Sequence, residues 1–469
     1  MIARLGLKLS AIFQRIVPDP FVIAVALTLI TAVGALLLGS FPALDSDTPR
    51  ARLLSILDAW RGGEGLWKFL AFGMQMCLIL VTGHALAASR SVSRAIERLA
   101  SVPRSAHAAG AFVALIAALA GLINWGLGLI VGALLAREVA RALSRRGVRV
   151  HYPLLVAAGY MGLLVWHGGL SGSAPLSSTT IEQMNRVFPA DSVALIGEQI
   201  LTPLDQSLGS TLNLLATGGA VLLIPLIIWF LCPRHDHDRT PPPDALLAQT
   251  PAPASPPADE PSYAAARLDR SPIVAGILAG LILLALARHA QVDGLTRIGP
   301  NEINLAMLAL GLIAHGSLRS YATAAEEACR GCAGIMLQFP LYAGILAMLR
   351  ESGLILQTAE FLRSISTPET LPLATMTSAA LVNLAVPSGG GQWGIQGPIA
   401  MQTAVDMGVS PARMIMAVSY GDQLTNMLQP FWALPLLAIT GAKARDIVGY
   451  TAIVMLAVGA WFALALFLF

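Results

Sequence analysis

The chain has 469 residues, of which 55% are hydrophobic and only 12% are charged. Soluble domains carry about 25% charged residues, so this composition excludes a soluble enzyme, a disordered protein and, with four cysteines, a disulfide scaffold. The formal net charge of +3 is too small to imply a nucleic-acid partner, and the mean hydropathy of +0.69 indicates a polytopic membrane protein.

Eleven stretches without Asp, Glu, Lys or Arg are candidates for membrane-spanning helices, which need about 20 apolar residues. They are 21–44, 69–89, 105–136, 152–181, 206–233, 271–287, 303–318, 331–349, 370–405, 423–442 and 447–469. The first follows three basic residues, as a signal peptide would, but its apolar run is longer than a signal sequence. The sequence therefore predicts an all-α polytopic membrane protein with about 11 transmembrane segments.

Two stretches, 105–136 and 370–405, have the wrong length for one straight crossing. A helix of either length would extend about 48–54 Å, whereas the hydrocarbon core is about 30 Å thick, and two full crossings need about 40 residues plus a turn. Each stretch has a helix-breaking centre, at residues 124–128 and 387–391. We predict a re-entrant helical hairpin for each, with a long bent helix as the alternative for either one.

The loops beside the two predicted hairpins differ in charge. Loop 90–104 has four arginines and one glutamate, and loop 137–149 has five arginines and one glutamate. Both are expected in the cytoplasm, since cytoplasmic loops carry the excess of basic residues. The flanks of the second hairpin, 350–369 and 406–413, are nearly neutral. We therefore expect the hairpins to enter from opposite sides.

Residues 232–270 predict a disordered cytoplasmic linker, because they contain nine prolines and few large apolar residues. They include His235-Asp236-His237-Asp238, which we interpret as solvated residues, with a metal site as the alternative. The linker divides the chain into two units of similar size, 1–231 and 271–469.

The two units are similar in sequence at nearly one offset. The matched segments are 73–76 with 336–339, 122–124 with 381–383, and 158–160 with 418–420. Each unit contains a hairpin with an asparagine near its tip, and then a span broken by polar residues at about 152–181 or 414–442. With opposed hairpins this is an inverted repeat, an arrangement that places a substrate site near the midplane, where broken helices meet.

Two hairpin tips and two broken spans should therefore form one site. No Arg or Lys lies in these pieces, which argues against a multivalent anion and favours a small monocarboxylate. The candidate substrate-binding residues are Asn124, Gly126, Gly128, Ser171, Ser173, Asn383, Ser388, Gly389, Gly390, Thr425 and Asn426. The alternative is that the hydroxyls bond their own helices and the glycines allow close packing.

Asp422 is the one acidic residue well inside a predicted span. A carboxylate in the membrane is costly, so a functional role is the first hypothesis: it can carry a proton or help to bind Na⁺. The alternative is a carboxylate that caps the broken helix end. His167 borders the first break and is a further candidate for the coupling ion, as are Asn124 and Asn383.

Six segments carry a resemblance to a known family. LAFGMQMCLILVTGHALA (70–87), INWGLGLIVGALLAREVARA (123–142), GGLSGSAPL (168–176), QFPLYAGI (338–345), VPSGGGQWGIQGP (386–398) and QPFWALPLLAI (429–439) resemble the bacterial short-chain fatty acid transporter family, of the acetoacetate and butyrate uptake type. The resemblance covers nearly the whole chain outside 232–270. The family is placed in the ion transporter superfamily, whose characterised members are similar to divalent anion–sodium symporters.

The resemblance implies opposed hairpins with Asn124 and Asn383 at their tips, an elevator motion and a dimeric scaffold. The dicarboxylate members of the superfamily have Ser-Asn-Thr at the tips, whereas this chain has Ile123-Asn124-Trp125 and Val382-Asn383-Leu384. Because of that departure, the resemblance gives weaker support for a dicarboxylate substrate and for a two-Na⁺ stoichiometry in this chain. Members of the family often have Glu where Asp422 stands, so an acid is retained.

We expect a secondary active transporter of short-chain fatty acid anions such as acetoacetate and butyrate, coupled to H⁺ or Na⁺. It should be a homodimer in the bacterial inner membrane, with the N-terminus in the cytoplasm and no cofactor besides the coupling ion. The alternative is a carrier for dicarboxylates or another small organic anion. An enzyme is disfavoured, because the sequence has no HExxH, GxSxG or Walker loop and no His–carboxylate pair at a catalytic spacing. A channel is disfavoured because its filter usually needs a symmetric ring of subunits.

Overall fold

The computed structural model describes residues 18–44, 48–185, 198–243, 264–292, 300–354, 364–385 and 388–469, together with residues 7, 8, 11, 12, 15, 188, 294, 357, 360 and 361. The regular secondary structure of these residues is helical. By length and composition, eight segments can span a membrane: Pro20–Leu38, Leu70–Ala88, Ala106–Ile123, Tyr152–Ser177, Thr211–Leu231, Pro272–Val292, Leu318–Glu351 and Ala444–Leu468. The prediction of an all-helical membrane protein is confirmed.

The number of full-length spans in the described residues is smaller than the eleven that the sequence predicts, because three apolar stretches form shorter or more polar helices. Residues 303–318 lie mostly in α16 (Pro300–His315), which has 16 residues. The stretch 370–405 forms α20 (Leu371–Ala385) and α21 (Gly389–Met407). The last forms α23 (Pro430–Thr440), which has 11 residues and follows α22 (Pro411–Thr425).

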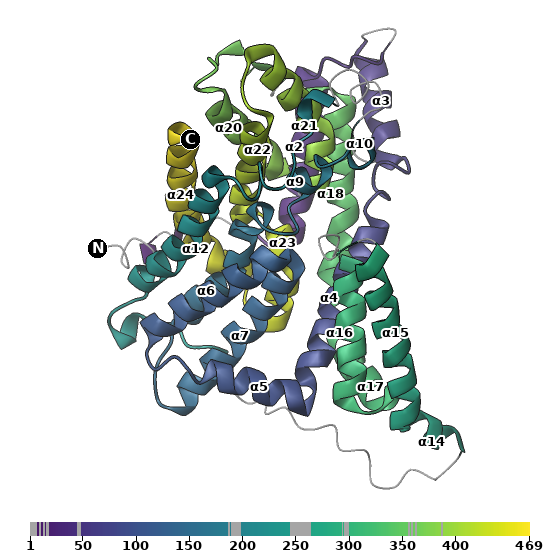
Figure 1. The fold of residues 1–469 in the computed structure, drawn as a ribbon, viewed down its shortest axis with the longest axis vertical. Coiled ribbons are helices and arrows are strands. Elements are labelled where there is room, and N and C mark those ends of the chain that lie inside the picture. The colour runs from purple at the N-terminus through teal and green to yellow at the C-terminus, as the bar shows by residue number, and fades with distance from the viewer. Residues whose placement is uncertain are drawn as a thin grey trace.

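Both stretches of unusual length form two helices. In the first, α6 (Ala106–Ile123) and α7 (Trp125–Arg145) meet at Asn124 and pack against each other, as the arms of a bent helix would not. In the second, α20 and α21 are joined at residues 386–388, and both also pack against α22. The α6–α7 pair lies in the lower half of the molecule and the α20–α21 pair in the upper half (Figure 1).

The two spans that follow these helix pairs are interrupted. The first consists of α8 (Tyr152–Tyr160), two 3-10 turns (Met161–Leu164 and Trp166–Gly168) and α9 (Ser173–Ser177), followed by α10 (Ile181–Asn185). The second consists of α22, a 3-10 turn (Asn426–Leu428) and α23. Pro430 begins α23, where its missing N–H costs nothing. We refer to residues 161–172 as break 1 and to residues 426–429 as break 2.

The remaining helices complete two groups, and each group takes helices from both halves of the chain. The first group, on the right of Figure 1, packs α2 (Pro20–Leu38), α3 (Pro49–Arg61), α4 (Leu70–Ala88), α15 (Pro272–Val292), α16, α17 (Leu318–Cys329) and α18 (Ala333–Glu351). The second packs the two helix pairs and the two interrupted spans with α12 (Thr211–Leu231) and α24 (Ala444–Leu468). Helix α5 (Arg90–Ala100) contacts both α4 and α7 at the lower end.

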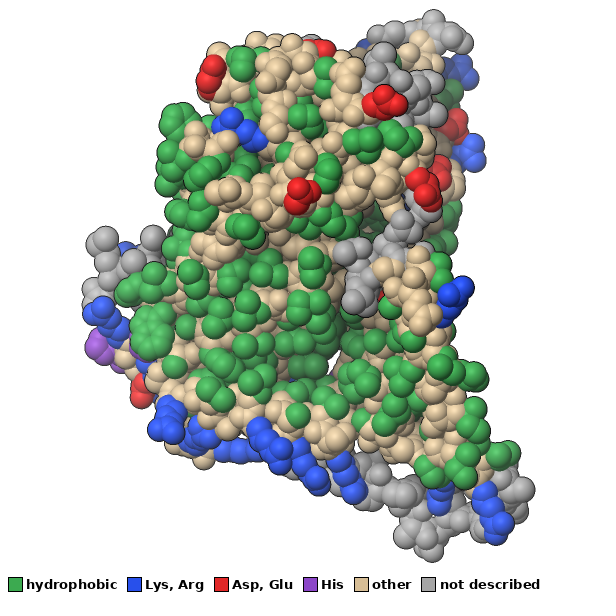
Figure 2. All heavy atoms as spheres, viewed as in Figure 1, with side chains coloured by type: hydrophobic (Ala, Val, Ile, Leu, Met, Phe, Trp, Pro, Cys, Tyr) green, Lys and Arg blue, Asp and Glu red, His purple; other side chains and the backbone are tan. Residues whose placement is uncertain are grey.

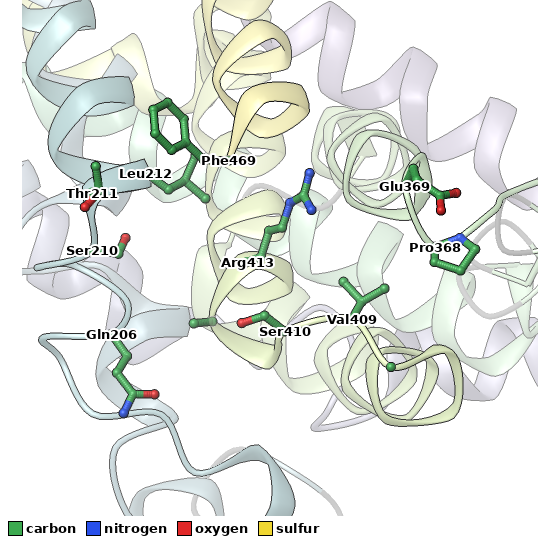
Figure 3. Close-up of a pocket in the computed structure, with 12 residues that line it drawn as sticks. Gln206, Ser210, Thr211, Leu212, Pro368, Glu369, Val409, Ser410, Arg413 and Phe469 are labelled. Atoms are coloured by element: carbon green, nitrogen blue, oxygen red, sulfur yellow. The ribbon is translucent and has the colours of Figure 1, made fainter.

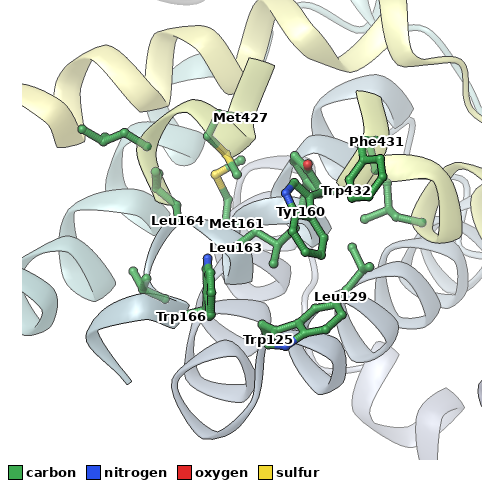
Figure 4. Close-up of a cluster of buried hydrophobic side chains, with 14 of the residues drawn as sticks. Trp125, Leu129, Tyr160, Met161, Leu163, Leu164, Trp166, Met427, Phe431 and Trp432 are labelled. Carbon is green, nitrogen blue, oxygen red and sulfur yellow. The ribbon is translucent and has the colours of Figure 1, made fainter. Parts of the chain in front are cut away.

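Aromatic side chains join the two groups. Phe72 on α4 lies 6.2 Å from Trp125 on α7 and 5.9 Å from Trp432 on α23, between ring centroids. Phe339 on α18 stacks on Phe431 of α23 at 4.0 Å. The contact between the groups is therefore apolar and lacks ion pairs at these positions, and Figure 4 shows its second-group members Trp125, Phe431 and Trp432.

The first residues of the predicted linker are described and lie against the helical body, whereas residues 244–263 lie outside the described residues. The N–H of Tyr152 donates to the carbonyl of Thr240 at 2.8 Å, and the N–H of Thr240 donates to Nδ1 of His151 at 3.0 Å. The short helix α14 (Ala264–Asp269) precedes α15. The disordered linker stays a prediction.

Close glycine contacts hold α7 against α8, which gives a testable expectation for Gly132→Ala. A Cβ at Gly132 would lie against the carbonyl oxygen of Gly159 and 2.8 Å from its carbonyl carbon. Because both obstructing groups are backbone, the helices must separate, and we expect a stability loss at the upper end of about 1–3 kcal/mol. Gly218→Ala on α12 is the matched control, since a Cβ there meets nothing within 4 Å. Equal melting temperatures of the two variants in detergent would contradict this expectation.

Candidate functional site

A histidine and an aspartate from the two interrupted spans meet in the interior. Nδ1 of His167 lies 2.7 Å from Oδ2 of Asp422, and the two residues are 0% and 1% exposed. Nε2 of His167 accepts the N–H of Ala174 at 3.1 Å, so the ring proton is on Nδ1 and is donated to the carboxylate. The ring is therefore neutral. The sequence predicts both residues as candidates but not their contact, because 255 residues separate them.

Buried polar atoms without a hydrogen-bond partner lie on Asp422 and on residues that hydrogen bonds or ring stacking link to this pair. Three are oxygens that accept: Oδ1 of Asp422, Oδ1 of Asn383 and Oε1 of Gln429. Three are N–H groups that donate, on the side chains of Gln423, Asn426 and Trp166. An unpaired buried polar group costs about 1–3 kcal/mol, so this concentration is unfavourable unless a ligand uses it. The N–H groups suit a carboxylate, and the oxygens suit a cation or a proton.

Asn383 ties the end of α20 to the end of α22 and to break 2. Its Nδ2 donates to the carbonyl of Asp422 at 2.6 Å, to Oγ1 of Thr425 at 3.0 Å and to Oδ1 of Asn426 at 2.9 Å. The side-chain amide of Gln429 donates to the carbonyl of Asn383. Thr425 also donates to the carbonyl of Ala380. The structure therefore brings Asn383, Thr425 and Asn426 together, mostly bonded to one another.

Asn124 has a different role at the other turn. Its Oδ1 accepts the N–H groups of Gly126 at 2.9 Å and Leu127 at 3.2 Å, which caps the N-terminus of α7. The N–H of Trp125 donates to Oγ of Ser171 at 3.1 Å, and this bond ties the first turn to break 1. The capping bonds at Asn124 thus use the amide oxygen, whereas the bridging bonds at Asn383 use the amide nitrogen.

The start of α21 lies over break 1. Ser388 caps α21 through a bond from the N–H of Gly391 at 3.1 Å. A Cβ at Gly389 would lie 2.8 Å from the Trp166 ring and 3.2 Å from Cε1 of His167, and one at Gly390 would lie 3.9 Å from Oγ of Ser173. Only glycine allows the helix to approach His167 this closely. The structure thus brings the predicted residues of this turn to the His167–Asp422 pair.

The two glycines predicted on α7 contact their own helix pair. A Cβ at Gly128 would lie 2.6 Å from Cα of Gly121 on α6, and one at Gly126 would lie 3.3 Å from the capping oxygen of Asn124. Their environment matches the alternative in which glycines permit close packing.

Hydroxyl groups donate to the backbone carbonyls that break 2 releases from helical bonding. Sequence reasoning missed these hydroxyl groups. Tyr160 OH donates to the carbonyls of Asn426 at 2.9 Å and Gln429 at 3.3 Å, and Oγ1 of Thr451 donates to that of Met427 at 2.5 Å. These carbonyls are therefore used within the protein. Figure 4 shows Tyr160 and Met427 among the apolar side chains beside the break.

A side chain also donates to a backbone carbonyl of break 1. Nδ2 of Asn213 on α12 donates to the carbonyl of Gly168 at 2.9 Å, and Tyr420 OH donates to Oδ1 of Asn213 at 3.1 Å. Tyr160 and Tyr420 are the tyrosines that the predicted repeat aligns, and each supports the break in the other half of the chain, Tyr420 through Asn213. The sequence alignment of 158–160 with 418–420 pairs the two tyrosines, but it does not show which groups their hydroxyls bond.

Two cavities in the described part of the chain do not contain the centre of this site. One of about 190 Å³ adjoins break 2 and is lined by Ile23, Tyr160, Met427, Leu428, Gln429, Pro430, Ala433, Ala444, Ile447, Val448 and Thr451. A larger one of about 490 Å³ lies between the start of α12 and the turn before α22, with Arg413 and Glu369 in its lining (Figure 3). None of its lining residues belongs to either break, so the unpaired polar atoms, and not cavity size, mark the site.

Known sequences match this chain over nearly its full length. The sequence model of the family described as short chain fatty acid transporter matches residues 1–469. A candidate short-chain fatty acid transporter of Escherichia coli (strain K12) is 38% identical over 100% of both chains. One of Haemophilus influenzae is 35% identical over 96% of both. The crystal structure of the Alcanivorax borkumensis YdaH transporter aligns with a TM-score of 0.39 and 18% identity, covering 96% of this chain and 97% of that one.

Proposed function

Since this chain belongs to the short chain fatty acid transporter family, we propose that it is a secondary active transporter that moves acetoacetate, butyrate and similar anions across the inner membrane, coupled to H⁺ or Na⁺. One observation carries the proposal: the buried His167–Asp422 pair is linked to residues with unpaired donors and acceptors on both interrupted spans and on α20.

The substrate class is supported by the chemistry of these groups. The side-chain N–H groups of Gln423, Asn426 and Trp166 can bind one carboxylate. The residues of the breaks and turns include no Arg or Lys that could pair with a second carboxylate. The aromatic face of Trp166, which stacks on His167 at 4.3 Å, offers an apolar surface to a short alkyl chain. A small monocarboxylate fits this combination better than a dicarboxylate.

The coupling ion has two candidate modes of binding. Oδ1 of Asp422 can bind a proton, because its other oxygen already accepts from His167. Alternatively, Oδ1 of Asp422, Oδ1 of Asn383 and Oε1 of Gln429 supply oxygen ligands and one negative charge to Na⁺. Either mode neutralises Asp422 when the substrate anion is present, which reduces the cost of holding two negative charges in a buried site.

The orientation and the motion are part of the same proposal. The lower end of the molecule carries a row of basic side chains (Figure 2), from the loops beside α6 and α7, and we assign it to the cytoplasm. The α6–α7 and α20–α21 pairs lie in opposite halves of the molecule, which supports opposed re-entrant hairpins and an inverted repeat. The second helix group then moves against the first across their aromatic contact, as in an elevator. The homodimer stays a prediction.

Labelled butyrate uptake into proteoliposomes tests the proposal. We expect saturable uptake that acetoacetate inhibits and that a proton or Na⁺ gradient drives above the level of protein-free vesicles. Protein-free vesicles are required because the undissociated acid crosses a bare bilayer by itself. Competition by succinate would favour the dicarboxylate alternative, and the absence of protein-dependent uptake under any ion gradient would refute the proposed function.

A further inference from the structure

Helix α5 presents a row of arginines at the lower end of the molecule. It runs across the direction of α4 and α16 instead of along it (Figure 1). Arg90, Arg94 and Arg98 are spaced by four residues, so they share one face of the helix, and all three are exposed. The half-buried Val92 and Ile96 lie on other faces, where α5 packs against α4, α7 and α16.

Neighbouring loops extend this row. Arg104, Arg145, Arg146 and Arg149 are also exposed, and the guanidinium of Arg146 donates to the carbonyl of Ser101 at 2.9 Å, which places the end of α7 beside the end of α5. Figure 2 shows the basic side chains as a nearly continuous row along this end. We call these seven arginines the arginine row.

The positive charge of the arginine row is not balanced within the described part of the chain. No ion pair there involves any of its seven members. Glu138, which lies within α7 and not in the loop that the sequence predicts at 137–149, is buried and pairs with Arg137 at 2.9 Å and with Arg141 at 2.6 Å. Glu97 on α5 forms no ion pair with these arginines in the described part of the chain. The seven neighbouring guanidinium groups therefore carry an excess of positive charge that favours the binding of anions.

The position of the row identifies the anion. It lies where α4 ends at Ala88, α6 begins at Ala106 and α7 ends at Arg145, which is the level at which spanning helices leave the hydrocarbon core. Leu99 and Val102, which are 39% and 58% exposed, give the same region an apolar edge. A cationic helix with an apolar edge, lying in the plane of the interface, binds anionic lipid surfaces.

We propose that the arginine row binds the headgroups of anionic phospholipids, with Arg90, Arg94 and Arg98 of α5 at its centre. Guanidinium groups form paired hydrogen bonds with phosphate oxygens, so the contact is ionic and directional. Because α5 connects α4 of the first helix group to α6 of the second and contacts both α4 and α7, the bound lipids hold the segment that joins the two groups.

The lipid preference of the purified full-length protein tests this proposal. The protein is equilibrated in detergent micelles with equal amounts of phosphatidylglycerol and phosphatidylcholine, and retained lipids are counted by native mass spectrometry. We expect the parent to retain phosphatidylglycerol preferentially. R90Q/R94Q/R98Q should weaken that preference by roughly 100-fold, since each basic residue near an anionic surface contributes about a fivefold gain in association.

Two matched variants make the outcome specific. R90K/R94K/R98K keeps the three charges and should keep most of the preference. R50Q/R61Q/R350Q removes three exposed charges from the end where α3 lies and should leave the preference nearly unchanged. If the triple Gln variant does not fold, each single Gln variant should weaken retention by about fivefold. Equal retention of both lipids by the parent, or an unchanged preference in the Gln variants, would overturn the proposal, and neither result depends on transport.

Discussion

Asp422→Asn is expected to abolish the accumulation of butyrate that an ion gradient drives, while the protein remains folded. Asparagine keeps the shape of aspartate and an oxygen that accepts from His167, where the parent distance is 2.7 Å. It can neither bind a proton reversibly nor balance the charge of Na⁺ in a buried site. Symport with one proton accumulates substrate about tenfold per unit of pH difference, and the variant should fall to the protein-free level. The measurement is labelled uptake into proteoliposomes under separate proton and Na⁺ gradients.

The matched control for this substitution is Asp406→Asn on α21. Asp406 is exposed and accepts a bond from Gln402 at 2.8 Å, so the same chemical change there should leave uptake unaltered. If a proton gradient drives the parent and Asp422→Asn loses that drive, Asp422 carries the proton. If only Na⁺ drives uptake and Asp422→Asn still accumulates butyrate, the carboxylate is a structural cap and our assignment of Asp422 is wrong.

His167→Asn separates two roles for the histidine. The asparagine amide can place an N–H near the position of Nδ1, so it can still donate to Asp422, but it cannot take up a proton. Substantial coupling in this variant would make His167 a positioning residue that orients the carboxylate. Complete loss of proton-driven uptake, with the fold retained, would instead place the histidine on the proton path.

The helical elements of the site were predictable because their signals are local. The two stretches of unusual length, each with glycines at its centre, form the helix pairs α6–α7 and α20–α21. The Gly-rich and Pro-flanked segments near 168 and 429 form the breaks. These features depend on backbone preferences over a few residues, and a single sequence contains them.

The bonding within the site was not predictable, because it depends on tertiary contacts. The residue type of Asn124 and Asn383 is the same, but one turn exposes backbone N–H groups and the other faces carbonyl oxygens. Likewise, the contact of His167 with Asp422 and the support of each break by a tyrosine of the other half join residues more than 200 positions apart. Sequence pattern identifies which residues are polar in an apolar span, and only the fold shows which of them remain unpaired.

Asn383→Asp is expected to reduce butyrate transport by more than about 100-fold, because this asparagine acts as a donor. Its Nδ2 group faces three oxygen acceptors, the carbonyl of Asp422 and the side chains of Thr425 and Asn426. A carboxylate there would leave these acceptors unpaired and add a second negative charge beside Asp422. Unpaired buried groups cost about 1–3 kcal/mol each, and about 3 kcal/mol corresponds to a 100-fold loss. Initial uptake rates and melting temperatures in detergent measure the effect.

Asn124→Asp provides the contrasting substitution at the other hairpin turn. The new carboxylate keeps the acceptor for the N–H groups of Gly126 and Leu127, and a negative charge is favourable at the N-terminus of α7. This variant removes only what the Nδ2 group of Asn124 contributes, so we expect it to retain clearly more transport than Asn383→Asp. If the two variants lose transport equally at equal stability, both asparagines act through the same chemistry. The tips would then be equivalent ligands of the substrate or ion, in place of the helix cap and donor bridge inferred from their hydrogen bonds.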